Sequence, residues 1–331
     1  MKSKAIFLDR DGTLIKDTGY LHKVEDIEFL PGVVDALKKL KAFKLFIITN
    51  QAGISKKNFL LEDMHRVNAF ISKELLNHKI KIEHIYYCPH TPQDNCQCRK
   101  PKTMLIKSAQ KEYDIDLKNS LVIGDKPADI MLAKNAGCKS VYLLTGHGLE
   151  YLEEARKAVP DYISAEFIRA ADYVLFRNED KIKSIKEVSE IALELRKKKK
   201  RIVTLNGTFD ILHAGHDYMV SEAKKQGDIL IVGVNSDSSV KSNKGKHRPI
   251  NNEMSRGKMM ASYKEVDYVT LFNEKTPIEL LEIIKPDVHV NGSEYGENCI
   301  EAPTVKKHGG KIHIVGLLPG YSSTGILAKK G

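Results

Sequence analysis

Short apolar runs alternate with longer amphipathic stretches along most of the chain. In the first part the apolar runs begin at Ala5, Leu45, Ile85, Leu121 and Val141, and helix-sized stretches at 33–42, 61–78, 103–113 and 128–136 separate them. Strand-sized runs that alternate with helix-sized stretches are typical of a parallel sheet with helices on both faces. The pattern predicts an α/β domain over residues 1–148.

The same pattern restarts after Arg201. Apolar runs at 202–205, 229–234, 268–271, 288–290 and 311–315 alternate with helix-sized stretches at 215–226, 253–263, 277–284 and 301–308. We therefore predict two Rossmann-like parallel-sheet α/β domains, the second over residues 201–331.

The stretch between them, residues 149–200, is mostly helical in period and weak in strand signal, and it ends in six basic residues from Arg196 to Arg201. We predict a mostly helical linker. The basic run would suit nucleic acid or a membrane surface, but we favour a solvated helix end, where cations oppose the negative end of the helix dipole.

Composition narrows the classes of function. The 331 residues are 42% hydrophobic, an ordinary globular value, and 53 Lys and Arg against 43 Asp and Glu leave a charge of +10. That excess suits nucleic acid, anionic membranes or small phosphates. No apolar run is long enough to span a bilayer, no signal peptide is evident, and the five cysteines do not form a disulfide framework. We expect a cytoplasmic protein.

Polar side chains follow the apolar runs of the first domain. Asp9 and Asp11 come after the first run, Thr49 after the second and Asp125 after the fourth, while Lys100 precedes a helix. Ligands of open parallel sheets bind at the carboxyl ends of the strands. Two carboxylates at i and i+2 can divide nucleophilic and acid/base roles, and a third can hold Mg²⁺. One such residue would more often be a helix cap, but several converging strand ends favour a phosphoryl-transfer site.

These segments resemble the four motifs of haloacid dehalogenase-type phosphatases over residues 5–147, namely Asp9-Arg-Asp-Gly-Thr13, Thr49-Asn50, Lys100 and Gly124-Asp125-Lys126. The resemblance implies that Asp9 forms an aspartyl-phosphate and that Asp11 is the acid/base. It also implies that Asp9, the Asp11 carbonyl and Asp125 bind Mg²⁺. Thr49, Asn50 and Lys100 would hold the phosphoryl group.

Four metal-ligand residue types lie within eleven positions of one another: Cys88, His90, Cys96 and Cys98. Four such ligands suit a tetrahedral structural zinc, although the spacing is tighter than in common zinc fingers. With Gly19-Tyr-Leu-His22 they resemble the zinc-containing branch that includes heptose bisphosphate and histidinol phosphatases. That resemblance implies a zinc-stiffened loop leading into Arg99 and Lys100, and we expect Arg99 and Lys126 to bind substrate. Ser55-Lys56-Lys57 stands where the heptose enzymes tend to carry Arg.

In the second domain a glycine-containing strand end precedes a helix that opens with His213-Ala-Gly-His216. A helix N-terminus of this kind is a phosphate cradle, and two imidazoles three positions apart can donate to the same phosphates. A metal site and an ordinary capped helix start are the alternatives. The residues of this predicted phosphate cradle are Asn206, Gly207, Thr208, Phe209, His213 and His216.

This stretch resembles the nucleotidylyltransferase superfamily, with further matches at Val234-Asn-Ser-Asp237, Lys244-Gly245, Arg248-Pro249, Arg256 and Ser322-Ser323-Thr324. The likeness is strongest to the adenylyltransferase domain of ADP-heptose synthesis and weaker to glycerol-3-phosphate cytidylyltransferase. It implies that the histidines stabilise the nucleotide phosphates, that Lys244 and Arg256 bind substrate, and that Ser322, Ser323 and Thr324 bind the β- and γ-phosphates. Met254 stands where the family often has Glu.

Together the two resemblances imply a bifunctional enzyme of ADP-heptose and lipopolysaccharide biosynthesis. It would remove the 7-phosphate of heptose 1,7-bisphosphate and join heptose 1-phosphate, as the β-anomer, to AMP from ATP. We expect Mg²⁺ in both sites, sugar phosphates and ATP as partners, neither nucleic acid nor membrane, a homodimer through the second domain and a separate heptose 7-phosphate kinase. The alternatives are a different sugar or polyol phosphatase fused to a cytidylyltransferase, and a catalytically silent anion- or nucleic-acid-binding scaffold.

Overall fold

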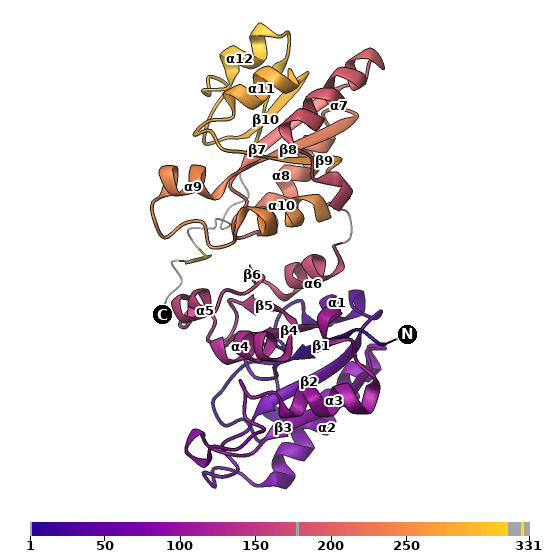
Figure 1. The fold of residues 1–331 in the computed structure, drawn as a ribbon, viewed down its shortest axis with the longest axis vertical. Helices are drawn as coiled ribbons and strands as arrows, with labels where there is room; N and C mark the ends of the chain where they lie inside the picture. Colours follow the sequence, from indigo (N-terminus) through magenta and orange to yellow (C-terminus); the bar gives the residue numbers. More distant parts are fainter. Residues whose placement is uncertain (1, 177–178, 317–325, 328–331) are drawn as a thin grey trace. The chain divides into compact units, whose positions relative to one another are not determined.

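The chain folds into two compact units, with the division between Ala171 and Asp172. The computed structural model describes residues 2–176, 179–316 and 326–327 (Figure 1). Each unit contains one sheet, and all strand pairs within the two sheets are parallel. The predicted fold class is confirmed.

The first unit has a six-stranded sheet in the order β3-β2-β1-β4-β5-β6. Its strands are β1 (Ala5–Leu8), β2 (Lys44–Asn50), β3 (Ile82–Cys88), β4 (Leu121–Gly124), β5 (Lys139–Leu143) and β6 (Tyr162–Ser164). Its helices are α1 (Val33–Lys39), α2 (Leu61–Asn77), α3 (Met104–Tyr113), α4 (Pro127–Ala136) and α5 (Leu152–Lys157), with α6 (Phe167–Leu175) across the division.

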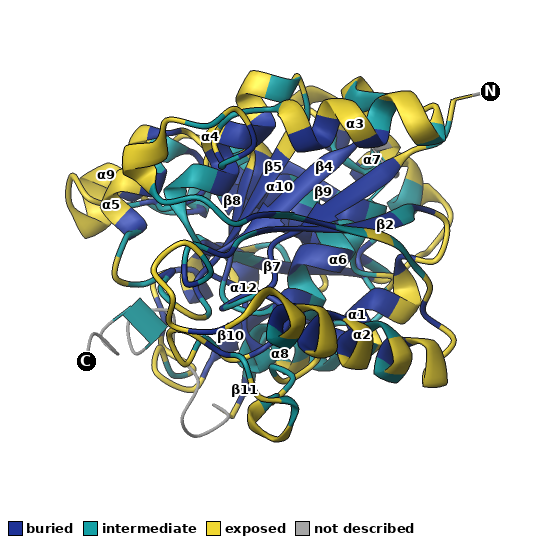
Figure 2. Ribbon diagram, turned by 90° about the horizontal axis from the view of Figure 1, so that it is seen from below, coloured by how far each residue is buried: buried dark blue, intermediate teal, exposed yellow. Residues whose placement is uncertain are grey.

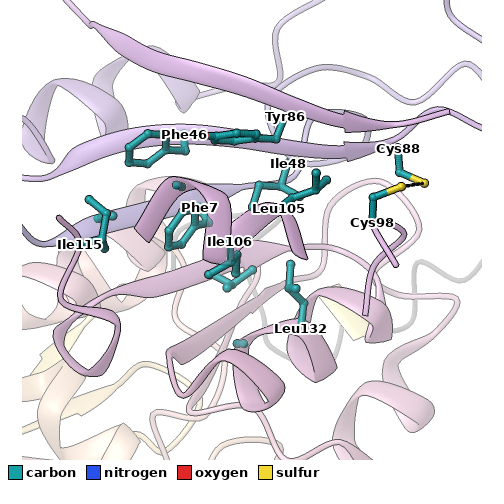
Figure 3. Packing of buried hydrophobic residues seen from close by; sticks show 14 residues of the cluster. Phe7, Phe46, Ile48, Tyr86, Cys88, Cys98, Leu105, Ile106, Ile115 and Leu132 are labelled. Carbon is teal, nitrogen blue, oxygen red and sulfur yellow. Dashed lines mark hydrogen bonds between the residues drawn. The ribbon is translucent and has the colours of Figure 1, made fainter. Parts of the chain in front are cut away.

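The centre of this sheet is buried on both faces. All four residues of β1 are buried, which explains why the strand reads as a continuous apolar run rather than an alternating one. Phe7 of β1 stacks on Phe46 of β2 with ring centroids 5.4 Å apart. On this face Leu105 and Ile106 of α3 and Leu132 of α4 complete the core (Figure 3).

The second unit has a five-stranded sheet in the order β11-β10-β7-β8-β9. Its strands are β7 (Ile202–Gly207), β8 (Ile229–Asn235), β9 (Tyr268–Phe272), β10 (Val288–Gly292) and β11 (Lys311–Val315). Its helices are α7 (Ile185–Lys197), α8 (Ala214–Lys224), α9 (Asp237–Lys244), α10 (Glu253–Ser262), α11 (Ile278–Ile284) and α12 (Ala302–Lys307). The central strands of both sheets are mostly buried, while the edge strands β3 and β11 are mostly half-buried and the helices expose their outer faces (Figure 2).

The predicted linker over residues 149–200 is not a separate segment in the structure. Strand β6, which lies inside it, extends the first sheet by pairing with β5, Val141 opposite Tyr162. Helix α7 belongs to the second unit, because its buried Val188 and Ala192 pack with Ile202 and other residues of that core. The predicted boundaries at 148 and 200 therefore differ from the observed division, which falls inside α6.

The basic run Arg196 to Arg201 forms the end of α7 and the turn into β7. Arg196 donates to the carbonyl of Ile284 at 2.5 Å, and Lys200 lies 3.3 Å from Asp228. The run therefore lies at the end of a helix and in the turn after it, and its interpretation as a solvated helix end stays a prediction. Among the described residues, no helix is both long and apolar enough to cross a bilayer.

The order of strands reverses once in each sheet. In the first unit the reversal lies between β1 and β4, and in the second between β7 and β10. Crevices at such reversals, outside the carboxyl ends of the strands, are the usual ligand sites of open α/β sheets. The residues after β1 and β4, and those after β7, therefore lie where each unit is expected to bind its ligand.

Candidate active sites

The carboxyl ends of β1, β2 and β4 bring together the residues predicted for phosphoryl transfer. Asp9 follows β1 and its N–H donates to the carbonyl of Ile123 in β4 at 2.9 Å. Thr49 lies near the end of β2, and Asp125 follows β4. All three predicted side chains are buried.

Three buried carboxylates form a group that suits a hard divalent cation. Oxygens of Asp9, Asp125 and Asp129 all lie within 4.8 Å of one another. Oxygen ligands in such number are what Mg²⁺ prefers. The sequence prediction missed Asp129, although its place four residues after Asp125, in the first turns of α4, was a usable signal. The Asp11 side chain is not part of this group, which leaves its backbone carbonyl as the predicted ligand.

Burial and the neighbouring charges shift the pKa values of the carboxyl groups in this group. Burial, together with the negative charges of Asp9 and Asp129, raises the pKa of Asp125 to about 7. Burial also raises the pKa of Asp129 to about 6, against the opposing effect of Lys100. Carboxylates crowded in this way bind a cation favourably, because it relieves both their burial and their mutual repulsion.

Lys100 neutralises part of this charge. Its buried ammonium lies 2.7 Å from Asp9 Oδ1 and 2.7 Å from Asp129 Oδ1. Burial lowers the pKa of Lys100, but the two carboxylates raise it above its ordinary value. Asn50, predicted to hold the phosphoryl group, binds the Lys100 backbone: it accepts from the Lys100 N–H at 3.0 Å and donates to the Lys100 carbonyl at 3.4 Å.

Lys126 lies at the edge of the site and has a carboxylate partner that the sequence prediction missed. Its ammonium is 2.9 Å from Asp17 Oδ2, and His147 Nε2 is 3.4 Å from the same oxygen. Burial lowers the pKa of Lys126, while Asp9, Asp125 and Asp17 raise it well above its usual range. The His147 N–H donates to Asp125 at 3.0 Å, so the 145–148 loop also orients a predicted metal ligand.

The four predicted zinc ligands converge after β3. The Cys98 sulfur is 3.2 Å from the Cys88 sulfur (Figure 3). It is also 3.2 Å from His90 Nδ1, and the Cys96 sulfur is 3.5 Å from both other sulfurs. These separations are a few tenths of an ångström shorter than the separation of about 3.8 Å between sulfurs around a tetrahedral ion with metal–sulfur bonds of about 2.3 Å, so a small outward shift lets all four atoms bind one ion. The donor set therefore fits the expected zinc.

Residues near the phosphoryl-transfer site donate hydrogen bonds to carbonyls of the loop that carries the predicted zinc ligands (residues 88–98, the zinc loop). The Gln51 N–H donates to the Cys88 carbonyl at 2.7 Å. Arg99, predicted to bind substrate, donates to the His90 carbonyl at 3.1 Å. Lys102, which we did not predict, donates to the carbonyl and side chain of Asn95 and, at 2.7 Å, to the Cys96 carbonyl.

In the second unit the predicted phosphate cradle forms at the end of β7 and the start of α8. His213 precedes α8 and His216 lies in its first turn, with ring centroids 4.0 Å apart. Burial lowers the pKa of His213. The Phe209 ring covers Gly207, where a β-carbon would lie 3.1 Å from it, and Thr208 stands between them in sequence. Asn206 Oδ1 is buried without a hydrogen-bond partner among the described residues.

Arg256 is placed differently from its predicted role as a substrate ligand. It is 0% exposed, and its guanidinium donates to the Thr208 carbonyl at 2.7 Å, to the Asn251 carbonyl at 3.0 Å and to Asp237 Oδ1 at 2.8 Å. Glu253 accepts from the Asp237 N–H at 2.7 Å. Glu253 thus joins the arginine network from the position before Met254.

The remaining predicted residues of the second site lie around the segment after α9. Arg248 Nε is 2.9 Å from Asp210 Oδ2, and Asp210, which we did not predict, also accepts from the Ile250 N–H. Lys244 ends α9 and is exposed. Partial desolvation and the nearby Arg248 cation lower its pKa. Ser322, Ser323 and Thr324 lie outside the described residues.

Comparisons with known proteins find similarities to both parts of the chain. The HAD-hydrolase-like family matches residues 97–170. A D-glycero-beta-D-manno-heptose-1,7-bisphosphate 7-phosphatase of Helicobacter pylori is 42% identical over 151 residues, 45% of this chain and 87% of that protein. The chain belongs to this heptose-bisphosphate phosphatase family. A Campylobacter jejuni member, named for the alpha-anomer of the same bisphosphate, is 40% identical over 44% of this chain and 84% of its own length.

The Cytidylyltransferase-like family matches residues 204–318. A bifunctional protein HldE from a Nitratiruptor species is 36% identical over 65% of this chain and 41% of that protein, so the chain spans about two fifths of this relative. A crystal structure of D,D-heptose 1,7-bisphosphate phosphatase from B. bronchiseptica is 28% identical, covers 52% of this chain and 98% of its own, and has a TM-score of 0.49.

Proposed function

We propose that the chain is a bifunctional enzyme of ADP-heptose biosynthesis. The first unit removes the 7-phosphate of D-glycero-D-manno-heptose 1,7-bisphosphate, and the second transfers AMP from ATP to heptose 1-phosphate with release of pyrophosphate. The phosphatase half is supported by the buried Lys100 ammonium between Asp9 and Asp129, beside Asp125. Family membership supports the substrate class.

Phosphoryl transfer in the first unit begins at the Asp9 carboxylate. One Asp9 oxygen attacks phosphorus while the bond to the sugar oxygen breaks, and Asp11 gives that oxygen a proton. In the second step Asp11 takes a proton from water as the water oxygen attacks phosphorus, which frees orthophosphate and restores Asp9. Lys100 offsets the charge of the transferring group. Asp9, Asp125, Asp129 and the Asp11 carbonyl would hold Mg²⁺, which would supply further positive charge.

The transfer in the second unit depends mostly on positioning and charge stabilisation. The imidazoles of His213 and His216, at the N-terminus of α8, are placed to donate to the nucleotide phosphates. Lys244, exposed at the end of α9, is placed to neutralise phosphate charge. Arg256 acts indirectly, by holding the Thr208 carbonyl. Mg²⁺ bound with the nucleotide would offset charge on the triphosphate, and Ser322, Ser323 and Thr324, outside the described residues, stay predicted ligands of the β- and γ-phosphates.

The identity of the sugar anomer and the nucleotide belongs to the same proposal. Phosphatase relatives named for the beta- and alpha-anomers are 42% and 40% identical to the chain, a difference too small to separate them. The transferase type favours the β-anomer and ATP, and CTP is the competing nucleotide. A silent scaffold is disfavoured, because burying Asp9, Asp125 and Asp129 together is costly without a bound cation.

Zinc at Cys88, His90, Cys96 and Cys98 is proposed as a structural ion, since all four positions of a tetrahedral ion are filled by the protein. We further propose a cytoplasmic homodimer paired through the second unit, with neither nucleic acid nor membrane as a partner. A separate kinase would supply the bisphosphate. Size measurement in solution tests the dimer.

The decisive experiment supplies heptose β-1,7-bisphosphate, ATP and Mg²⁺ and measures orthophosphate, pyrophosphate and sugar nucleotide separately. Asp9→Asn should abolish orthophosphate release and leave adenylylation of added heptose 1-phosphate intact. His216→Ala should have the reverse effect. Loss of both activities in both variants would contradict two independent sites, and CTP outcompeting ATP would contradict the adenylyltransferase assignment.

A further inference from the structure

The Asp11 carboxylate is enclosed by nitrogen donors that come from two different segments. Arg10 Nε lies 3.2 Å from Asp11 Oδ1 and 3.1 Å from Oδ2, and Arg10 Nη2 lies 3.1 Å from Oδ1. Gln51 Nε2 donates to Asp11 Oδ2 at 2.9 Å. Both oxygens of the carboxylate are therefore held, and the side chain cannot rotate without breaking charged hydrogen bonds.

Arg10 has no access to a substrate of its own. The residue is 1% exposed, and its remaining Nη1 donates at 2.9 Å to Asn68 Oδ1 on α2. Asn68 is itself buried and also contacts the Met64 sulfur. The guanidinium is thus anchored to a helix on one side and holds Asp11 on the other, an arrangement that fits a supporting role and not a binding one.

Gln51 reaches the same carboxylate from the end of β2. Its side-chain nitrogen also donates to Thr49 Oγ1 at 2.6 Å, and its own N–H is bonded to the Cys88 carbonyl. Gln51 therefore links Thr49, Asp11 and the zinc loop. Its side chain is almost fully buried, so its amide nitrogen makes its hydrogen bonds inside the site and not with solvent.

We propose that Arg10 and Gln51 are positioning residues that fix the Asp11 carboxylate for proton transfer, an inference that rests on the proposed phosphatase function. Asp11 gives a proton to the sugar oxygen when the phosphorus–oxygen bond breaks, and it takes one from water when the bond to Asp9 breaks. An acid or base works only within hydrogen-bond reach of its target, and displacement by about 1 Å can cost about a hundredfold in rate.

The leaving group separates this role from a general structural one. A sugar alkoxide is a poor leaving group that needs a proton from Asp11, whereas p-nitrophenolate leaves without one. The ratio kcat/KM reports only the steps up to the first phosphoryl transfer. A misplaced Asp11 should therefore lower kcat/KM for the sugar phosphate far more than for p-nitrophenyl phosphate. Because hydrolysis of the aspartyl-phosphate still needs Asp11, phosphorylated Asp9 should accumulate with p-nitrophenyl phosphate, whose first step is little slowed.

The test compares wild-type protein with Arg10→Lys and Gln51→Met, and with Arg66→Gln as the control. Arg66 is exposed on α2, two residues before Asn68, and pairs with Asp63. Gln51→Met keeps the side-chain length and removes the hydrogen-bond donor. If Arg10→Lys does not fold, this variant alone tests the positioning role. We expect kcat/KM for heptose bisphosphate to fall about a hundredfold in the variants, while KM stays within a few fold. The fall in kcat/KM for p-nitrophenyl phosphate should be about tenfold smaller.

Two results would overturn the inference. One is an equal loss of kcat/KM for both esters, which would indicate general damage to the site, and the other is no loss for the sugar phosphate. If the wild-type protein with Mg²⁺ hydrolyses neither ester, the proposed phosphatase function fails and the inference fails with it. Wild-type turnover with no differential effect in the variants would overturn the positioning role alone.

Discussion

A β-carbon on Gly12 would lie 2.2 Å from Asp125 Oδ2, far inside contact distance. Gly12 also has a φ of +82°, which side chains with a β-carbon rarely adopt. The turn after β1 therefore approaches the carboxylate after β4 so closely that only glycine fits. The Thr13 hydroxyl, which donates to Asp125 Oδ1 at 3.0 Å, depends on the same approach.

Gly12→Ala should abolish orthophosphate release, by more than about a hundredfold, because the new methyl group displaces Asp125. Gly137→Ala is the matched control, since Gly137 also has a positive φ of +74° but open space around its α-carbon. Both variants carry similar backbone strain, so only the clash differs. Comparable losses of phosphatase activity in both would refute this account, and adenylylation should be unchanged in either.

Removal of the zinc should inactivate the phosphatase and spare the transferase. The loop that ends in Cys98 continues directly into Lys100, whose ammonium must stay at Asp9. We expect phosphatase activity to fall in proportion to zinc content, measured by metal analysis after treatment with a chelator, with Mg²⁺ kept in excess. Full activity in zinc-free protein would disprove the link.

Lys102→Met should speed this loss of zinc, because the lysine ammonium ties Asn95 and Cys96 together. Lys107→Met, an exposed lysine of α3, is the control. The measurement is the rate of zinc release to a colorimetric chelator. We expect Lys102→Met to release the ion several times faster than the control, and identical rates would show that the lysine contacts do not hold the loop.

Arg256→Lys should lower adenylylation by about ten- to a hundredfold, because a lysine cannot serve the Thr208 and Asn251 carbonyls and Asp237 at once. Met254→Gln, on the exposed side of the same helix, is the control. If Arg256 acts through the Thr208 loop, kcat should fall with a modest change in the KM for ATP. A pure rise in the KM would instead indicate direct contact with the substrate.

The second unit should lose stability in mild acid because of His289. Burial lowers the pKa of this histidine to about 4, and its Nδ1 is 2.8 Å from Thr204 Oγ1. In the unfolded chain the histidine pKa is about 6.5, so between pH 6.5 and pH 4 the unfolded state binds a proton that the folded state does not bind. Stability should therefore be complete above pH 6.5 and decline toward pH 4, by at most about 1.4 kcal/mol per pH unit.

Urea unfolding of wild-type protein and His289→Gln at pH 7 and pH 5 measures this effect. The variant should be less stable at pH 7 and should lose less free energy of unfolding between the two pH values. His247→Gln, in an exposed segment, is the control. Equal pH dependence in His289→Gln and wild-type protein would contradict the assignment.

The sequence predicted the positions that depend on local pattern. Asp9 and Asp125 were found because each directly follows an apolar strand, and the zinc ligands because their spacing is short. Asp17 was missed because nothing local marks a carboxylate that meets its partner Lys126 only in the folded chain. Gln51 directly follows β2, but the local pattern does not show that its amide reaches Asp11.

Contacts between distant parts of the chain explain the elements that the apolar pattern of the sequence did not predict. Strand β6 is only Tyr162–Ser164, and it becomes a strand by pairing with β5 at the edge of the sheet. Helix α9 is too polar for an apolar period to reveal, and it starts where Ser236 caps it by accepting from the Ser239 N–H. The burial of Arg256 depends on Asp237 and Thr208, which are distant from it in sequence.

The division of the chain inside α6 affects how the two halves can be separated. A cut after residue 148 would remove β6 and leave β5 as an open edge that invites aggregation. A start at residue 201 would strip α7 from the second sheet and expose Ile202, Ile231 and Phe272 to solvent. Each half made in isolation should therefore be cut between Leu175 and Glu179, because Lys181 and Lys183 donate to the Tyr263 and Val269 carbonyls of the second unit. Fusions built from other pairs of these enzymes should be joined there too.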